Sequence, residues 1–392
     1  MKKLSTVLFA ALTIALAVSG ALTGCTQKTA AAKSPSVKAQ MTAVTEIDKY
    51  GDIRLSVTTK DLLDAGFDYA DVVSVKFLDK ALELPLIPAY RYVAAKGSAL
   101  VAFKDQLERA AELEIFNGSF ADTYNVATKT TNEDKSFYWT ANSGVAFPVS
   151  VEISLAKKQG YYKDYLVFYL NRTNDRNNYA NLSDEQFANF REVTTSGMGA
   201  KKLYRASSPV NPEIGRNTYA DKAAQNAAVK TFMNLADSKA AAEKYAGYDA
   251  SYYSQQHVVF LGLGVDFTLP ANRDGLAEGL RFFAANDAPY LVHCNEGQDR
   301  AGFVSAVLEC LMGASLAEVK ADYMTTYENY YGVKKGTDQY NAISENIEKN
   351  LRTAFGVQNL ASINLSNAAT AYLKEIGLTD GEIATLKQKL GK

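Results

Sequence analysis

Cysteine and histidine are scarce in this chain of 392 residues. There are three cysteines, Cys25, Cys294 and Cys310, and two histidines, both in the second half of the chain. So few cysteines cannot supply the disulfide framework of a small secreted domain. The first half lacks histidine altogether, so it has no cluster of histidine, cysteine and carboxylates typical of a metal site. We therefore expect no disulfide network, no metal and no cofactor.

A surplus of positive charge is also missing. The chain has 42 Lys and Arg against 43 Asp and Glu, a net charge of −1 and a pI of about 6.2. Because nucleic-acid binding needs a basic surface, we expect no nucleic acid among the partners. Apolar residues make up 47% and charged residues 22%, which is ordinary for a globular protein. The length suffices for two domains, each with its own core.

The N-terminus is typical of a targeting segment. Lys2 and Lys3 precede an apolar run, 7–18, which is too short to span a bilayer as a mature helix. The sequence Leu-Thr-Gly-Cys that ends at Cys25 resembles the lipobox of bacterial lipoproteins. The resemblance implies cleavage before Cys25, a diacylglyceryl group on its sulfur and an extracytoplasmic, membrane-anchored protein. The alternative is a plain secretory signal in which Cys25 is incidental.

The rest of the chain divides by composition and pattern. Residues 26–45 are rich in Ala, Lys, Ser and Thr, as in a flexible linker. Period-two alternation at 72–77 and 149–153 indicates strands, with helical patches at 59–65 and 104–113. The expected organisation is a signal peptide over 1–24, a flexible linker over 25–45, a β-rich domain of unknown function over 46–180 and a second domain over 181–392.

In the second domain, short apolar runs alternate with helical patterns. Strands are expected at 202–204, 229–235, 257–265 and 290–293, with helices at 220–228, at 275–285 and after residue 300. Helices are then expected at 316–331, 340–355, 365–376 and 380–390. Such alternation predicts an α/β fold, with a mostly parallel sheet flanked by helices.

The most informative segment lies between the last of these strands and the following helix. It places Cys294 and Arg300 with five residues between them and Gly297 midway. A strand-to-helix loop directs backbone N–H groups at one point, where the helix dipole favours an anion and a thiolate. The arginine fork can hold two oxygens of a phosphate. Cys310 would lie about 15 Å along the helix, beyond disulfide reach, and is expected to be a buried apolar residue.

The segment from His293 to Arg300 resembles the His-Cys-x5-Arg signature of protein tyrosine phosphatases. Asp299, Phe190-Arg191 and the run 204–207 (Tyr-Arg-Ala-Ser) make it most similar to the bacterial tyrosine and lipid phosphatase branch. The likeness covers roughly residues 187–390. It implies a metal-free reaction in which the Cys294 thiolate attacks phosphorus and water hydrolyses the phosphocysteine intermediate.

The resemblance also implies residue roles. Cys294 is the nucleophile, Arg300 holds the phosphoryl oxygens, and His293 helps to set the pKa of the thiol, although a packed strand-end histidine is the alternative. Arg205 either reaches the site or forms a surface ion pair. The expected substrate-binding residues are Asn295, Glu296, Gly297, Gln298, Asp299 and Arg205.

A general acid is expected on a loop upstream of the nucleophile. We favour Asp266, because it follows the strand predicted at 257–265 and Pro270 comes shortly after. Asp274 is a rival, but its place just before a helix indicates an N-cap. Asp299 is a second rival, which either takes part in catalysis or holds the loop.

Two positions depart from the family pattern. Ala301 stands where many tyrosine phosphatases have Ser or Thr, and that hydroxyl assists breakdown of the intermediate. Its loss predicts slow second-step hydrolysis unless another hydroxyl substitutes. Gln298 replaces the Lys frequent in lipid-directed relatives, and Glu296 adds negative charge to the loop. Both changes disfavour highly charged inositol polyphosphates.

The expected protein is therefore a membrane-anchored, cysteine-dependent phosphomonoesterase acting on phosphotyrosine-type monoesters of a protein or a small molecule. The helices over 316–355 are expected to form a lid over the site. The alternatives are a phytase-like inositol phosphate phosphatase and a non-catalytic lipoprotein that binds phospho-ligands, which Ala301 favours. A rhodanese or arsenate reductase role fits the glycine spacing less well. The physiological substrate, the role of the β-rich domain and the oligomeric state stay open.

Overall fold

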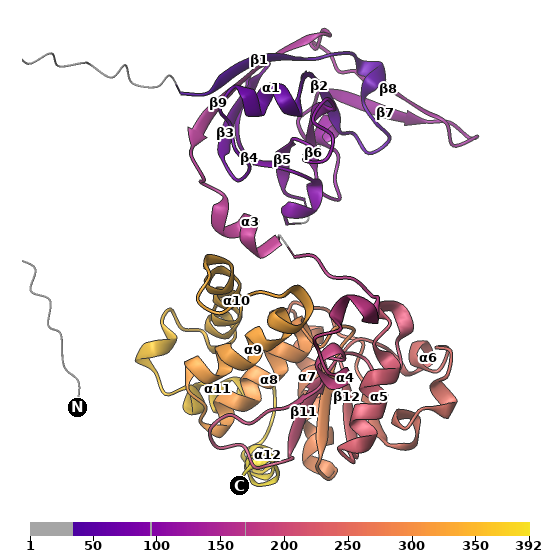
Figure 1. Cartoon of the computed structure of the whole chain (residues 1–392), viewed down its shortest axis with the longest axis vertical. Coiled ribbons are helices and arrows are strands. Elements are labelled where there is room, and N and C mark those ends of the chain that lie inside the picture. The colour runs from indigo at the N-terminus through magenta and orange to yellow at the C-terminus, as the bar shows by residue number, and fades with distance from the viewer. Residues whose placement is uncertain (1–33, 95, 169) are drawn as a thin grey trace, which may run out of the picture.

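The structure, a computed structural model, describes residues 34–94, 96–168 and 170–392. It consists of a β-rich unit and an α/β unit, which follow one another along the chain (Figure 1). The expected signal peptide, 1–24, and the expected lipidation site, Cys25, lie outside the described residues.

The β-rich unit is a closed seven-stranded barrel with the strand order β1-β2-β6-β5-β4-β3-β9. All neighbouring strands are antiparallel except β4 and β5, which are parallel. A separate hairpin, β7–β8, projects from the barrel (Figure 1). The elements are β1 (Ser36–Met41), β2 (Ile53–Thr58), α1 (Thr59–Asp64), β3 (Val72–Phe77), β4 (Lys80–Ile87), β5 (Ser98–Val101), β6 (Ala110–Ile115), α2 (Phe120–Thr123), β7 (Ala127–Thr131), β8 (Phe137–Ala141) and β9 (Val149–Lys157).

Alternating side chains build the barrel. In β2 the residues Ile53, Leu55 and Val57 are buried while their neighbours face outward, and β9 shows the same period. These inward side chains form one apolar core. Closure of the sheet leaves no free strand edge, so alternation can persist around the whole unit.

Two expectations about this half are wrong. The flexible linker predicted over 25–45 ends earlier, because Ser36–Met41 pairs with both β2 and β9 and closes the barrel. The helix predicted over 104–113 is absent in the described structure, where Ala110–Ile115 is strand β6. Its residues are good helix formers, but cross-strand pairing on both sides outweighs local propensity.

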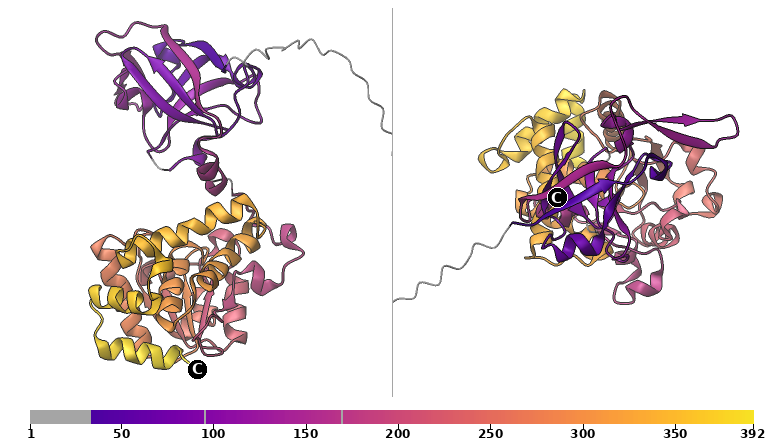
Figure 2. Two further views of the ribbon diagram at one scale, coloured as in Figure 1. Left: turned by 90° about the vertical axis from the view of Figure 1, so that its left-hand side faces the viewer. Right: turned by 90° about the horizontal axis from the view of Figure 1, so that it is seen from above.

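Helix α3 (Tyr162–Phe168) connects the two units and lies against α10 (Asp338–Phe355), as Figures 1 and 2 show. Lys163 forms an ion pair with Glu345 at 3.4 Å, and the Gln339 side chain donates to the Leu166 carbonyl at 3.2 Å. The chain therefore leaves the barrel along the helical side of the α/β unit.

The α/β unit has a five-stranded sheet in the order β10-β11-β14-β12-β13. The last four strands are parallel, and β10 is antiparallel to β11. This architecture confirms the predicted mostly parallel sheet flanked by helices. The strands are β10 (Arg191–Glu192), β11 (Leu203–Ala206), β12 (Thr231–Asn234), β13 (His257–Phe260) and β14 (Tyr290–His293).

Helix α8 occupies the middle of this unit, and eleven of its 14 residues are buried. It packs on β14 on one side, and α9, α10 and α11 surround it on the other (Figure 1). Cys310, inside α8, is a buried free thiol, as expected. The helices are α4 (Asp184–Phe187), α5 (Asn217–Asn226), α6 (Lys239–Ala242), α7 (Pro270–Ala285), α8 (Asp299–Met312), α9 (Leu316–Tyr331), α10, α11 (Leu365–Glu375) and α12 (Asp380–Leu390).

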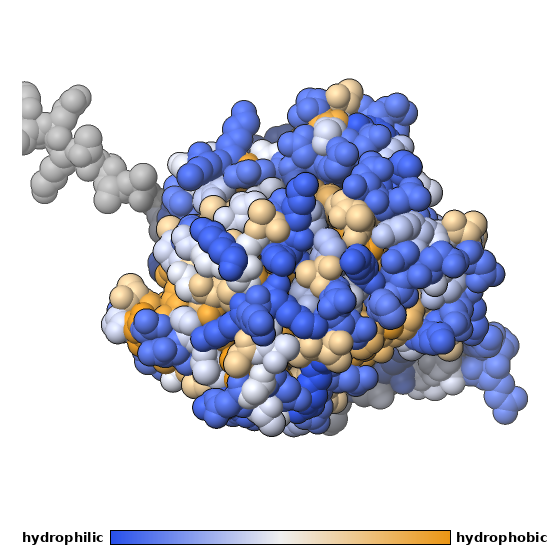
Figure 3. Space-filling view, turned by 90° about the horizontal axis from the view of Figure 1, so that it is seen from below, coloured by the Kyte–Doolittle hydropathy of each residue, from blue (hydrophilic) through white to orange (hydrophobic). Residues whose placement is uncertain are grey.

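Seen from below, the molecule presents mostly hydrophilic side chains, with hydrophobic ones interspersed (Figure 3). Among the described residues, no helix combines the length and the apolar character that crossing a bilayer requires.

Candidate active site

The loop from Cys294 to Gln298 connects the central strand β14 to the N-terminus of α8. β14 lies between β11 and β12, so the loop leaves the carboxyl edge of the parallel sheet, where α/β proteins place their sites. Cys294 is only 3% exposed and thus lies at the base of the loop. Gly297 has φ of +69°, and a Cβ atom there would lie 2.2 Å from the Ala206 carbonyl oxygen. Only glycine fits this close approach to β11.

The carbonyl groups of residues 295–298 accept hydrogen bonds from residues outside the loop. Ser208 N–H donates to Asn295 O at 3.0 Å, and Tyr330 Oη donates to Glu296 O at 2.9 Å. The Asn189 amide donates to Glu296 O at 3.0 Å and to Gly297 O at 3.3 Å. No backbone N–H of residues 295–300, all of which the structure describes, donates to a protein acceptor. With its carbonyls bound outward, the loop offers a ring of free N–H donors to an anion.

Arg205, on the neighbouring strand β11, binds the same loop. Its guanidinium is fully buried and donates through Nη2 to Gly297 O at 2.7 Å and to Gln298 O at 3.2 Å. Nη1 pairs with Asp322 at 2.6 Å, and Asp322 also pairs with Arg191 at 2.8 Å. Burial alone opposes a charge there, but the two arginines lower the pKa of Asp322 to about 2. Arg205 therefore reaches the loop and positions it through its carbonyls, and its complete burial excludes the alternative of a surface ion pair.

Arg300 lies in the first turn of α8. Its Nη1 donates to Leu263 O at 2.9 Å, which fixes the guanidinium against the segment after β13. Its Nε is buried and finds no acceptor among the residues that the structure describes. A buried N–H without a partner is costly, so this donor suits an oxyanion held by the loop.

His293 ends β14 and is fully buried. Its Nε2 lies 3.1 Å from Tyr253 Oη. Burial, and secondarily the charge of Arg300, lowers the pKa of His293 to about 3, with the Cys294 backbone opposing part of the shift. At neutral pH this imidazole carries no charge, so it positions the strand end and can act on the Cys294 sulfur only as a dipole.

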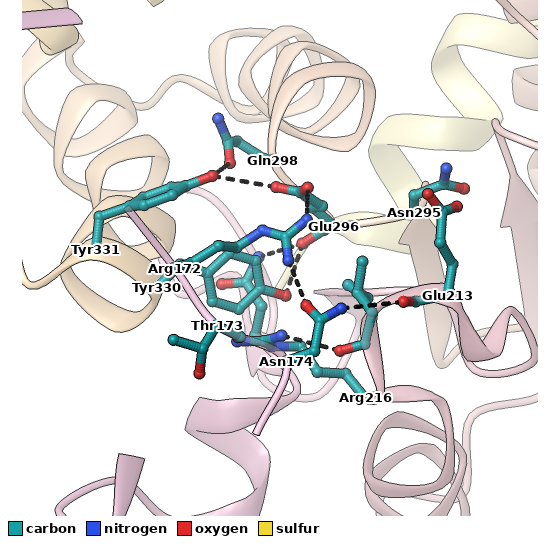
Figure 4. Close-up of polar contacts among 12 residues, drawn as sticks. Arg172, Thr173, Asn174, Glu213, Arg216, Asn295, Glu296, Gln298, Tyr330 and Tyr331 are labelled. Atoms are coloured by element: carbon teal, nitrogen blue, oxygen red, sulfur yellow. Dashed lines mark hydrogen bonds and ion pairs between the residues drawn. The ribbon is translucent and has the colours of Figure 1, made fainter. Parts of the chain in front are cut away.

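The side chains of Glu296 and Gln298 are engaged by neighbours (Figure 4). Arg172, on the segment between α3 and β10, forms an ion pair with Glu296, and Tyr331 Oη donates to it at 3.2 Å. Gln298 donates to Tyr327 Oη at 3.1 Å and accepts from Tyr331 Oη at 3.0 Å. Because Arg172 compensates the Glu296 charge, the negative charge that the sequence suggested for the loop is offset.

A cavity of about 280 Å³ opens next to the end of the loop, at Asp299, the first residue of α8. It brings Asp266 and Asp299 together, and helix α10 supplies one wall. The segment 316–355, predicted as a lid, thus contributes the tyrosines of α9 that contact the loop and also one wall of this cavity. The lining residues are Val265, Asp266, Phe267, Thr268, Asp299, Phe303, Asn350, Thr353 and Ala354.

The three candidates for the general acid differ sharply. Asp266 is exposed and accepts hydrogen bonds from the Thr268 hydroxyl at 2.6 Å and its N–H at 2.9 Å, which lower the pKa of Asp266. Asp274 lies within α7, which begins at Pro270, so its predicted role as N-cap is wrong. Asp299 is exposed on the surface of the cavity, although the packing around its carboxyl, followed by repulsion from Glu296, raises the pKa of Asp299. Only Asp299 is shifted in the direction that an acid requires.

Sequence reasoning missed the residues that reach the loop from elsewhere in the chain. Asn189, Arg172 and Tyr253 have no recognisable spacing relative to Cys294. The tyrosines of α9 follow the period of a helix face and could have been recognised as a stripe directed at one neighbour. Asn272 ties the Asp266 loop to α7, since it donates to Asp266 O at 2.7 Å and accepts from Gly264 N–H at 2.9 Å.

A search of family models matches residues 205–392 to the tyrosine phosphatase family. No curated protein matches the chain. Among solved structures, the core catalytic domain of the PP-IP phosphatase SIW14 from S. cerevisiae is similar at 19% identity, with 42% of this chain and 91% of that one covered and a TM-score of 0.27. An uncharacterised conserved protein from Thermotoga maritima is similar at 16% identity, with 30% and 35% covered and a TM-score of 0.22. The match thus spans about a third of the Thermotoga protein.

Proposed function

Residues 205–392 belong to the tyrosine phosphatase family, and we propose that this unit hydrolyses phosphotyrosine-type monoesters through a phosphocysteine intermediate. The observation that carries the proposal is the loop around Cys294. It combines unpaired N–H groups at 295–300 with the unpartnered Nε of Arg300. Together they supply donors to the equatorial oxygens of a phosphoryl group in a site largely closed to water.

In the first step the Cys294 thiolate attacks phosphorus, so an S–P bond forms and the ester P–O bond breaks. The leaving oxygen takes the proton of Asp299, whose raised pKa keeps it protonated closer to neutrality than an ordinary aspartate. In the second step water attacks phosphorus and passes its proton to the Asp299 carboxylate. The S–P bond then breaks, which releases phosphate and restores the thiolate.

The cavity beside the loop supports an aromatic leaving group over a polyanionic one. Phe267 and Phe303 are stacked in its wall with centroids 4.6 Å apart, and Val265 is 67% exposed. The lining described for this cavity includes two carboxylates and no Lys or Arg. A substrate with several phosphates would meet like charge there, whereas a phenyl ring would bury apolar surface.

Kinetics on a panel of substrates tests the proposal. We expect turnover of p-nitrophenyl phosphate and a phosphotyrosine peptide to exceed turnover of inositol hexakisphosphate. Cys294→Ala abolishes hydrolysis, whereas the matched Cys310→Ala, within α8, leaves it near wild type. Preference for inositol hexakisphosphate would favour the phytase-like alternative. Vanadate binding without any hydrolysis would favour a non-catalytic phospho-ligand receptor.

The acid is tested separately. Asp299→Asn should lower the rate with p-nitrophenyl phosphate less than the rate with phenyl phosphate, because a poor leaving group depends more on the proton. Asp266→Asn should affect both substrates alike. If Asp266→Asn instead shows the stronger loss with phenyl phosphate, Asp266 is the general acid.

We further propose that the chain is a membrane-anchored, extracytoplasmic lipoprotein, with the lipid on Cys25. The support is the lipobox-like sequence that ends at this residue. Cys25→Ala is expected to move the protein from the membrane fraction to the soluble fraction of cells, while Thr26→Ala does not. Retention of the alanine variant in the membrane would refute the anchor.

A further inference from the structure

The barrel has a cavity of its own, of about 530 Å³, remote in sequence from the phosphatase loop. It lies on the outer face of β2 and β6, since the inward residues of these strands form the barrel core. The lining combines acidic and aromatic side chains. The lining residues are Lys49, Tyr50, Asp52, Tyr90, Glu114, Ile115, Phe116, Asn117 and Gly118.

Two carboxyl groups face each other in this cavity. Arg54 pairs with Glu112 across β2 and β6, so the antiparallel register places Asp52 opposite Glu114. The first pair joins opposite charges, with 3.8 Å between its nitrogen and oxygen. The second places two carboxyl groups opposite each other, and like charges at these positions would destabilise the sheet. The fold therefore tolerates an unfavourable pair where a hydrophobic or oppositely charged one would be more stable.

The two carboxyls are compensated only in part, since the Ile115 backbone favours the charge on Asp52 and Arg109 favours the charge on Glu114. Glu114 is only 4% exposed, and within the residues that the structure describes neither it nor Asp52 forms an ion pair. Asp52 Oδ1 is buried and has no hydrogen-bond donor. Burial, followed by the charges of nearby carboxylates, raises the pKa of Asp52 to about 7 and that of Glu114 to about 9. These groups lack a positively charged hydrogen-bond donor.

Aromatic rings form the mouth of the cavity. Tyr50 is 62% exposed and Tyr90 is 53% exposed, and the Tyr90 and Phe116 rings lie 5.8 Å apart. The Lys49 ammonium lies 4.7 Å from the centre of the Tyr50 ring. Lys49 thus shows that an ammonium ion is accommodated on this ring, yet it makes no ion pair with Asp52 or Glu114 in the described structure.

We propose that this cavity binds a small ligand with a primary ammonium group and an apolar body. The ammonium would lie between Asp52 and Glu114 and donate to both, and the apolar body would lie against Tyr50, Tyr90 and Phe116. A quaternary ammonium has no N–H and would leave Asp52 Oδ1 unsatisfied. The rings favour an organic cation over a bare metal ion. The site is independent of the proposed phosphatase reaction.

Isothermal titration of the full chain at pH 8 tests this site. We expect saturable binding of n-butylammonium, and at least tenfold weaker binding of n-butanol and of tetramethylammonium. Binding should release protons, since the ammonium favours ionised carboxyls, and the heat should therefore vary with the ionisation enthalpy of the buffer. Nα-acetyl-lysine amide, titrated in parallel, distinguishes a lysine side chain from a free amine as the source of the ammonium. Tighter binding of either compound supports the site.

Variants separate this site from adventitious binding. Glu114→Gln should weaken n-butylammonium at least tenfold, whereas Glu83→Gln, an exposed change on β4, should not. Both variants should keep the phosphatase rate of the parent, which verifies the fold. Asp52→Asn replaces Glu114→Gln if the latter does not fold. Absence of saturable heat, equal binding of n-butanol or unchanged affinity in the Glu114 variant would overturn the proposal.

Discussion

Each unit of this chain contains a set of largely buried acidic groups, Asp322 in the α/β unit and the Asp52 and Glu114 pair in the barrel, and the two sets have opposite surroundings. In the α/β unit, Asp322 is compensated by Arg191 and Arg205, and the arginines in turn hold the loop of Cys294. In the barrel, Asp52 and Glu114 face each other without a counterion. The paired carboxylate Asp322 is a structural support, whereas the unpaired carboxyls Asp52 and Glu114 are the groups for which we propose a ligand. Four predictions test this contrast.

The largest effect is expected from removing the ion pairs that Asp322 forms with Arg191 and Arg205. Asp322→Asn removes the carboxylate that forms ion pairs with two buried arginines, Arg191 and Arg205, and should lower the free energy of unfolding by about 3–5 kcal/mol. Glu375→Gln, which removes an exposed ion pair with Arg273, should cost less than about 1 kcal/mol. Urea unfolding followed by circular dichroism at 222 nm measures both. Equal costs for the two variants would contradict the structural role of Asp322.

Gly297→Ala breaks the loop itself. The added Cβ meets the Ala206 carbonyl in a left-handed backbone conformation, so the N–H groups can no longer converge. Loss of such donors should reduce kcat on the order of 10²–10³-fold. Gly144→Ala in the barrel is the matched control, because Gly144 also has a positive φ, +82°, but an added Cβ there meets nothing within 4 Å. Steady-state kinetics should show an unchanged rate for that control.

The unpaired carboxyls of the barrel, Asp52 and Glu114, predict a free energy of unfolding that falls as pH rises. The folded state holds Glu114 protonated up to a pKa of about 9, whereas the unfolded chain loses this proton near its ordinary pKa of 4.5. The stabilisation is full below pH 4.5 and is lost as pH rises toward 9. Glu114→Gln removes this loss. The free energy of unfolding of the variant should therefore exceed that of the wild type by roughly 1–3 kcal/mol at pH 9 and by little at pH 4. Fluorescence of Trp139, the only tryptophan, follows unfolding of the barrel.

The smallest effect is expected at Ala301, which is fully buried in the first turn of α8. Without a hydroxyl at this position, breakdown of phosphocysteine should be slow, and stopped-flow traces should show a burst of p-nitrophenol. Ala301→Ser should raise the steady-state rate by up to roughly tenfold, the equivalent of one hydrogen bond, and diminish the burst. A wild-type trace without a burst would place the slow step before the intermediate.

Local patterns were sufficient for much of this architecture. The motif from His293 to Arg300 predicted a strand, a loop and a helix, and the structure shows β14, the loop and α8 there. The terminal helices also lie where the periodicity placed them. The prediction was wrong for 104–113, because the pairing of β6 with β2 and β5 cannot be read from its helix-forming residues.

Neighbouring residues along the chain were enough to predict the turn that holds Cys294, Gly297 and Arg300, because a strand-loop-helix connection is encoded locally. Tertiary structure decided what those residues can do. Asn189, Arg205 and Tyr330 come from three separate elements to bind the loop carbonyls, and the facing of Asp52 and Glu114 depends on strand register. Hydrogen bonding and charge act over a few ångströms in space, and only the fold brings residues so far apart in the chain within that range.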